Sequence, residues 1–128
     1  MNKESVFLVM ASLGLVPIAL VYGALPQFTV PVFYGVEVDT VNGAHIFRAV
    51  MGLYLGMVLF WLLGAANAAL RVPALYSLVV FMLGLAAGRA LSIVLDGMPS
   101  PAFVVYLGLE IFFGPLGLAL ARGLAARS

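Results

Sequence analysis

Three ionisable residues, Arg48, Arg89 and Glu110, lie inside stretches of sequence that are otherwise apolar. A guanidinium or a carboxylate in such a stretch pairs with an opposite charge or binds a polar group, because burying it alone costs free energy. Counted from the nearest ends of their apolar runs, the three side chains lie at about 6, about 9 and about 12 Å. We therefore predict that they meet in one buried polar site.

Helical spacing adds polar companions to each charge, because residues three and four positions apart share a helix face. The residues that the pattern assigns to a ligand-binding site are Arg48, Arg89, Glu110, Asp96, His45, Tyr54, Ser92 and Tyr106. Two arginines and one glutamate leave a surplus positive charge, which Asp96 would balance. The site is predicted to bind a small amphipathic ligand or lipid, with its apolar body among the helices and its polar or anionic head at the arginines.

Three other interpretations remain open for these residues. The long stem of Arg48 would let its charge extend to the membrane headgroups. Arg89 and Glu110 would form a buried pair that only fixes helix packing. Glu110 or His45 would transfer protons in an intramembrane enzyme, although no general acid–base pair can be assigned, so enzymatic activity stays uncertain.

The composition excludes an ordinary soluble domain. The chain has 128 residues, of which 65% are hydrophobic and 9% are charged, and its mean hydropathy is +1.21. Soluble domains carry roughly 25% charged and 45–50% apolar residues. The formal net charge of +1 and the lack of a basic patch argue against a nucleic-acid partner. There is no cysteine, and His45 with scattered carboxylates is weak evidence for a metal, so neither metal nor cofactor is predicted.

Four apolar runs are each long enough to cross a hydrocarbon core of about 30 Å as a helix. They cover residues 6–25, 44–66, 72–95 and 102–120, with short turn-forming connections between the last three. The first run resembles a signal peptide, but Tyr22 stands where cleavage favours a small residue. We therefore predict an all-α, polytopic membrane protein: an antiparallel four-transmembrane-helix bundle that forms a single domain over residues 1–128.

The charges outside the apolar runs predict how the chain is oriented. One side of the membrane would hold Lys3, Arg71, Arg122 and Arg127 with Glu4, and the other would hold Glu37, Asp39 and Asp96. Short segments rich in Lys and Arg stay in the cytoplasm, so both termini are predicted to be cytoplasmic. The apolar outer connection, residues 26–43, is expected to lie among the headgroups or to form a lid over the bundle.

Glycines recur at four-residue spacing in two of the runs, as Gly52-x-x-x-Gly56 and Gly84-x-x-x-Gly88. This spacing lets helices approach closely, and it predicts tight packing in the inner half of the bundle. The same glycine faces would alternatively contact a second copy or a partner subunit. In that case the protein is a structural or accessory subunit of a membrane complex, and its buried charges only lock helix packing.

The polar segments also resemble those of a known family. They are Asn42-Gly43-Ala44-His45-Ile46-Phe47-Arg48-Ala49-Val50-Met51-Gly52-Leu53-Tyr54, Gly88-Arg89 to Ser92, Asp96-Gly97, Pro99, and Tyr106 to Glu110. Over about residues 5–122 the chain is similar to a bacterial family of small four-helix integral membrane proteins catalogued as a domain of unknown function. The resemblance implies a multi-pass protein of the bacterial inner membrane, and it supplies no activity, substrate or cofactor.

Overall fold

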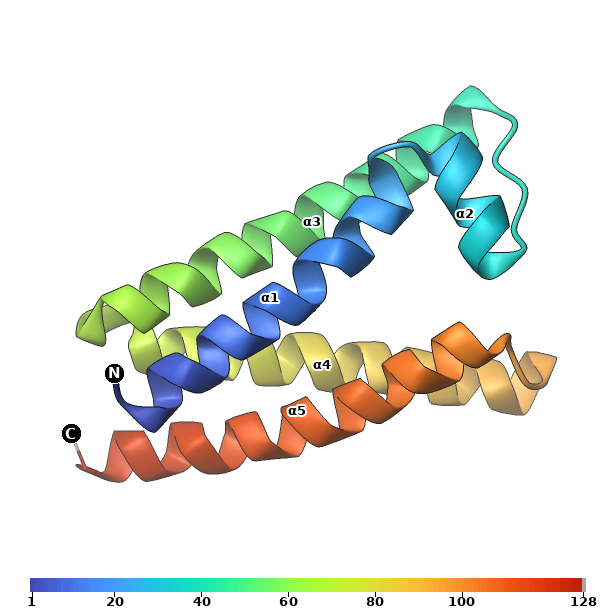
Figure 1. Ribbon diagram of the computed structural model, residues 1–128. Coiled ribbons are helices and arrows are strands. Elements are labelled where there is room, and N and C mark those ends of the chain that lie inside the picture. The colour runs from blue at the N-terminus through green and yellow to red at the C-terminus, as the bar shows by residue number, and fades with distance from the viewer. Residues whose placement is uncertain (128) are drawn as a thin grey trace.

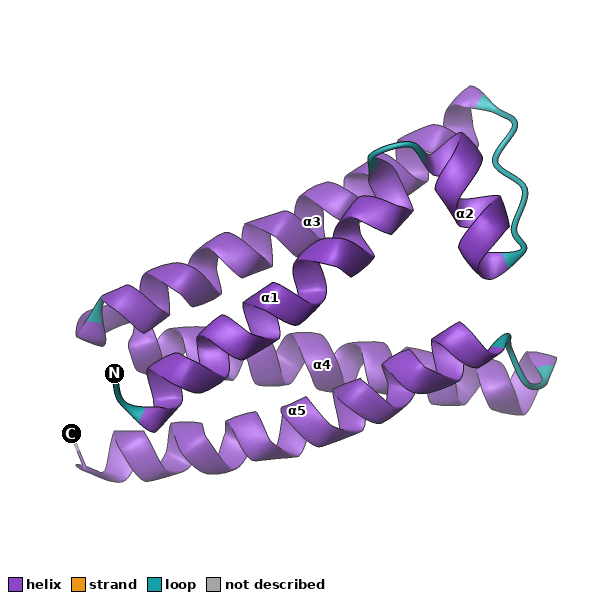
Figure 2. Ribbon diagram, in the orientation of Figure 1, coloured by secondary structure: helices purple, strands orange, loops and turns teal. Residues whose placement is uncertain are grey.

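The computed structural model describes residues 1–127 and contains five α-helices (Figure 1). They are α1 (Lys3–Gly23), α2 (Pro26–Tyr34), α3 (Val41–Ala66), α4 (Ala68–Asp96) and α5 (Pro101–Arg127). The connections are short loops, and residues 1–127 form no strand (Figure 2). Four of these helices, α1, α3, α4 and α5, are long and apolar enough to cross a membrane. The predicted all-α class is therefore confirmed.

Polar caps explain why the helices begin before the apolar runs do. The side-chain oxygens of Asn2, Thr40 and Asn67 accept hydrogen bonds from the backbone N–H groups of Ser5 (2.7 Å), Gly43 (3.0 Å) and Ala69 (2.9 Å). Such a cap satisfies a backbone donor that the helix cannot pair and contributes about 1 kcal/mol. The caps set the first residues of α1, α3 and α4.

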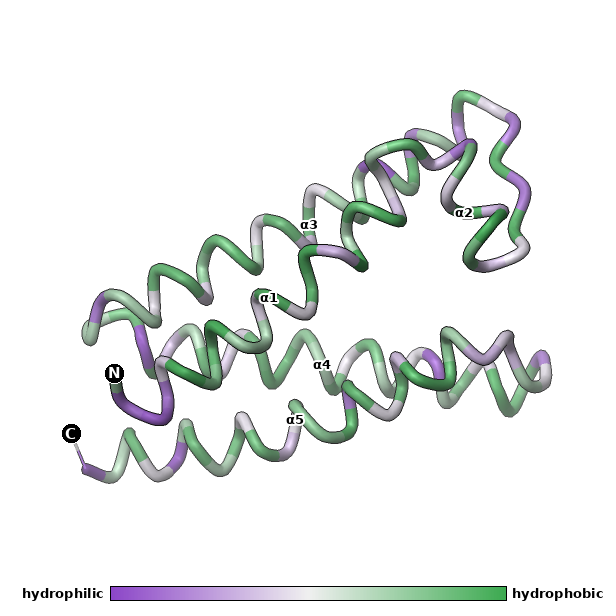
Figure 3. Tube along the Cα trace, in the orientation of Figure 1, coloured by the Kyte–Doolittle hydropathy of each residue, from purple (hydrophilic) through white to green (hydrophobic). Residues whose placement is uncertain are grey.

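The long helices form two antiparallel pairs, α1 with α3 and α4 with α5 (Figure 1). The two pairs lie close together at the end that holds both termini, and they separate toward the end that holds α2. Polar residues concentrate at these two ends, whereas the middle of each long helix is mostly apolar (Figure 3). The separation of the pairs creates the space in which the candidate site lies.

The outward sides of the long helices are apolar as well as the inward sides. Leu13, Val80 and Val94, for example, are 68%, 72% and 80% exposed. A helix that is apolar on all sides is typical of a membrane span, because lipid covers the outer side. The exposed apolar side chains thus support the same conclusion as the length and hydropathy of the helices, that these helices are suited to cross a membrane.

The glycines that allow close packing differ from those predicted. A Cβ atom at Gly52, Gly56, Gly84 or Gly88 would meet no atom within 4 Å, so the prediction of tight packing through these faces was wrong. A Cβ atom at Gly23 would overlap that of Met51, and one at Gly64 would overlap that of Ala74. Close approach therefore occurs between α1 and α3 near Gly23, and between α3 and α4 near their turn.

Residues 26–43 contain a helix, α2, in place of a continuous loop. Pro26 stands in its first turn, and Gly35, at φ 69°, ends it in the left-handed conformation that favours glycine. Phe28 and Val32 on its outer side are 70% and 79% exposed, whereas Tyr34 is buried. An apolar face outside the long helices is suited to the membrane interface, and the buried side of α2 contacts the candidate site.

Ionic and polar contacts join the segments at the terminal end. Glu4, which is 2% exposed, forms an ion pair with Arg127 and so links α1 to α5. Arg71 donates hydrogen bonds to the carbonyl groups of Gly64 (3.1 Å) and Ala65 (3.0 Å). Two of the basic residues that predict the orientation thus also stabilise the fold at this end.

Candidate functional site

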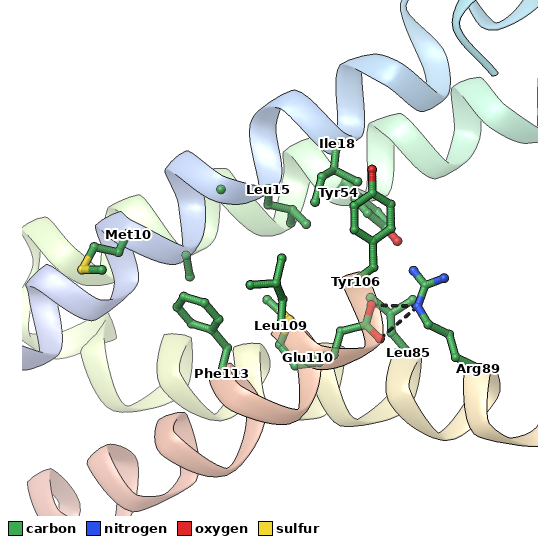
Figure 4. A pocket seen from close by; sticks show the side chains of 13 residues that line it. Met10, Leu15, Ile18, Tyr54, Leu85, Arg89, Tyr106, Leu109, Glu110 and Phe113 are labelled. Carbon is green, nitrogen blue, oxygen red and sulfur yellow. Dashed lines mark hydrogen bonds and ion pairs between the residues drawn. The ribbon is translucent and has the colours of Figure 1, made fainter. Parts of the chain in front are cut away.

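Arg89 of α4 and Glu110 of α5 form an ion pair inside the molecule (Figure 4). The Arg89 Nε–H donates to both carboxylate oxygens of Glu110, at 2.9 and 3.0 Å. Glu110 is 5% exposed, and it shares a buried face of α5 with Gly114 and Gly117, as its spacing predicts. A Cβ atom at Gly114 would collide with the Leu83 side chain of α4. The small residues below Glu110 thus let α4 and α5 pack closely enough for the pair to form.

Aromatic rings surround the Arg89 guanidinium on the sides that Glu110 leaves open. Its central carbon lies 5.6 Å from the ring centroids of both Phe103 and Tyr106. The Tyr22 hydroxyl, from α1, also interacts with the guanidinium. In Figure 4 its two terminal nitrogens point away from Glu110, toward the side of α1 and α3. A cation in this setting is stabilised by ring faces as well as by its counter-ion.

Tyr34 of α2 packs against the aromatic residues that contact Arg89. The hydroxyls of Tyr34 and Tyr106 are hydrogen-bonded at 2.7 Å, which joins α2 to α5. The Tyr34 ring centroid lies 4.6 Å from that of Phe103 and 5.2 Å from that of Tyr22. Burial, and then the hydrogen bond with Tyr106, raises the pKa of the Tyr34 phenol well above its usual range. The Tyr34 hydroxyl therefore stays protonated and neutral.

The hydrogen bond between Tyr34 and Tyr106 is expected to hold α2 over the site. Tyr34→Phe removes it while keeping the ring contacts, and a buried hydrogen bond contributes about 1 kcal/mol. We expect backbone amides of α2 to exchange with deuterium several-fold faster, measured by mass spectrometry in mild detergent. Tyr76→Phe, at a tyrosine that is 39% exposed on α4, is the control and should leave this rate unchanged. Equal rates in all three proteins would contradict this role of Tyr34.

Two cavities meet at Arg89. The first has a volume of about 260 Å³ and lies among α1, α3, α4 and α5, with Glu110 and Tyr106 at its polar end and Met10 and Gly14 in its apolar part. The second has a volume of about 640 Å³ and includes Ser92 and Gly88 in its wall. Arg89, Tyr54 and Leu85 line both cavities. An amphipathic molecule would thus find one polar position beside two largely apolar spaces.

Arg48 lies outside this site, which overturns the prediction of three charges in one place. Its side chain is exposed and, together with His45 and Asp39, lines a separate hollow beside the loop that follows α2. The buried face of α3 includes Tyr54, and Arg48 lies six residues before it. Six residues rotate a helix by about 600°, which is not a whole number of turns. Arg48 therefore points to another side of α3. The exposure of Arg48 agrees with the interpretation in which its long side chain extends to the headgroups.

Ser92 and Asp96 continue the face of Arg89 but lie beyond the buried part of α4. The Ser92 hydroxyl donates to the Asp96 carboxylate at 2.9 Å, and both residues are exposed. Ser92 lines the second cavity, whereas Asp96 lines neither of the two. The expectation that Asp96 balances a surplus charge was wrong, because with Arg48 outside the site Glu110 alone balances Arg89.

Sequence reasoning missed the contributions of α1 and α2 to the site. Tyr22 lies near the end of the first apolar run and Tyr34 lies within the apolar outer connection, so neither is an ionisable residue at unusual depth. Their common signal is a hydroxyl near the outer end of an element. Gly14 was also missed, because only the packing of four helices shows that it borders a cavity.

The described residues show no arrangement typical of a metal centre or of paired acid–base groups. Within residues 1–127, no three His, Asp or Glu side chains gather as metal ligands would. His45 and Glu110 line different cavities. The site therefore offers one charge pair, phenolic hydroxyls and apolar space, which suit binding.

Comparison with known proteins identifies a family but no activity. Neither the curated proteins nor the solved structures include a match to this chain. The model of a family described as "Domain of unknown function (DUF4345)" matches residues 4–121. The match covers α2, α3 and α4 completely and includes Arg89, Glu110 and the tyrosines around them. The chain therefore belongs to this family, the domain of unknown function DUF4345.

Proposed function

We propose that this protein is an integral protein of the bacterial inner membrane that binds a small amphipathic ligand or lipid at Arg89 and Glu110. Both termini would face the cytoplasm, because Arg71 lies in the first turn of α4 and Arg122 and Arg127 lie in the last two turns of α5. The site would then lie in the outer half of the membrane. The bacterial location is supported by the resemblance of the chain, and the membrane by its four apolar helices.

One observation carries the proposal: a buried ion pair forms part of the wall of a cavity that is otherwise mostly apolar. A pair that only locked two helices would need no space beside it, because protein interiors are close-packed. An apolar cavity with a few convergent polar groups is the usual form of a small-molecule site.

The two cavities suggest how the ligand lies. Its apolar body would occupy the first cavity, against Met10, Gly14 and Leu109, and its head would contact Arg89 and Tyr54. The second cavity would admit the ligand from the side, because part of its wall lies on α3 and α4, and α4 carries no side chain there at Gly84 and Gly88. Entry from the membrane is suited to a molecule that dissolves in lipid.

Filling the first cavity with a larger side chain tests directly whether the ligand binds there. Gly14 has open space where a side chain would project, so Gly14→Leu is expected to fill the first cavity without disturbing the backbone. We expect at least about a tenfold loss of the retained small molecule, measured by native mass spectrometry and lipid analysis after mild detergent extraction. The matched control is Gly108→Leu, at another open glycine, on α5, that borders neither cavity. Equal retention by both variants would exclude the first cavity as the binding site.

A second candidate function is that of a structural or accessory subunit. It is favoured by the open faces of Gly52 and Gly56, and of Gly84 and Gly88, which no part of residues 1–127 covers. Under this alternative, Gly52→Leu and not Gly14→Leu disrupts assembly with a second copy or a partner. The stoichiometry of the two variants, read by native mass spectrometry, separates the two functions.

A further inference from the structure

We infer that the ligand carries an uncharged head, an inference that rests on the proposed function and specifies its ligand class. It follows from the charges that surround the two cavities. The only charged side chains in the residues lining them are Arg89 and Glu110, and these are paired at 2.9 Å. The charges of Arg89 and Glu110 neutralise each other, so the site has no net charge with which to attract a charged ligand.

The charged groups nearby do not change this balance in favour of an anion. Asp96, the other ionised residue in the outer half of α4, is acidic and bonded to Ser92 in the wall of the second cavity. Arg48, the other cation in the outer half of the long helices, is exposed and lines a different hollow. A phosphate or carboxylate head would therefore meet the Glu110 carboxylate together with a guanidinium that is already neutralised, and like charges brought together oppose binding.

The polar groups that remain suit a hydroxyl or a carbonyl. Tyr54 is 5% exposed and lines both cavities, yet its hydroxyl has no hydrogen-bond partner among residues 1–127. The terminal nitrogens of Arg89 point away from Glu110, toward the side of α1 and α3 (Figure 4). A phenol both donates and accepts, and a guanidinium donates. A neutral head with both kinds of group would satisfy them without adding charge to an apolar site.

Two probes with the same tail test the inference in the wild-type protein. Monooleoylglycerol has an uncharged glycerol head, and oleoyl lysophosphatidate has the same head with one phosphate added. We expect monooleoylglycerol to bind at least about tenfold more tightly, measured by native mass spectrometry titration in a neutral detergent. Equal or tighter binding of lysophosphatidate would overturn the uncharged head and leave the proposed function standing. If neither probe bound, the proposed function would fall and this inference with it.

A charge variant checks the physical cause. Glu110→Gln keeps the shape of the side chain but leaves the charge of Arg89 unbalanced, so preference should shift toward lysophosphatidate by at least about tenfold. Asp96→Asn is the control: it removes a carboxylate that borders neither cavity, and should change the ratio less than about twofold at this exposed position. An unchanged ratio in folded Glu110→Gln would overturn the charge argument. If this variant does not fold, the wild-type comparison still decides.

Discussion

Glu110→Leu is expected to lower the free energy of unfolding by about 3–5 kcal/mol, because it leaves the Arg89 guanidinium, whose side chain is 19% exposed and lies in apolar surroundings, without its counter-charge. Arg89 loses both hydrogen bonds to the carboxylate, and among residues 1–127 its Nε–H has no hydrogen-bond partner other than Glu110. Arginine cannot lose its proton to escape this cost. The measurement is unfolding in mixed micelles with increasing denaturing detergent, followed through the fluorescence of Trp61, which is fully buried.

Arg89→Met is expected to cost less than Glu110→Leu. A lone carboxyl group in apolar surroundings can bind a proton and become neutral, whereas a lone guanidinium stays charged. The methionine also retains the apolar contacts of the arginine stem with Phe103 and Tyr106. The asymmetry between the two single variants is therefore part of the prediction.

The double variant Arg89→Met with Glu110→Leu is expected to recover most of the lost stability. Replacing both members of a buried ion pair with apolar residues of similar volume is often neutral or stabilising. If the double variant is stable and still retains the small molecule of the wild type, the pair serves packing alone. If it is stable but has lost that molecule, the pair contributes to binding. Additive costs of the two single changes would show that the residues do not act as a pair.

Gly64→Ala is expected to cost about 1–3 kcal/mol, the usual range for adding a methyl group to a well-packed place. The new Cβ atom would overlap that of Ala74 and lie 3.1 Å from the carbonyl oxygen of Leu70. Neither is the end of a flexible side chain, so α3 and α4 must move apart at their turn. The Arg71 hydrogen bond to the Gly64 carbonyl, at 3.1 Å, would be strained by the same movement.

The matched control is Gly56→Ala, on the same helix, where a Cβ atom has open space. Alanine favours a helix over glycine by up to about 1 kcal/mol, so this variant should be as stable as the wild type or more stable. Both variants are compared by thermal unfolding in the same detergent. A cost at Gly56 similar to that at Gly64 would indicate that the Gly56 face is covered by a second molecule in solution.

The number and antiparallel order of the long helices could be predicted from the sequence, because few structures satisfy the backbone hydrogen bonds of so apolar a chain in a membrane. A run of about 20 apolar residues in a membrane must pair its own backbone groups, and a helix does so. Short connections, such as the single residue Asn67 between α3 and α4, require neighbouring helices to be antiparallel. The pair of Arg89 and Glu110 was predictable for a related reason, since two opposite charges at similar depth on adjoining helices are each costly alone.

The rotation of each helix could not be predicted in the same way. Apolar side chains cover α3 on the lipid side as well as on the inner side, so hydrophobic periodicity does not identify which side packs. The buried face passes through Tyr54, Val58 and Trp61, because these large side chains fill the space against α1 and α4. That choice carries Arg48 out of the site and leaves the faces of Gly52 and Gly56 open.

By itself the sequence determined four apolar helices, their antiparallel order and one ion pair, because backbone hydrogen bonding and the cost of a lone charge in an apolar medium leave little choice. Only the tertiary structure decided which side of each helix faces inward. From that choice follow the two cavities, the approach of Tyr22 to Arg89 and of Tyr34 to Phe103, and the close contacts at Gly23 and Gly64. These features depend on how side chains of different helices fill a shared space, which no single apolar run specifies.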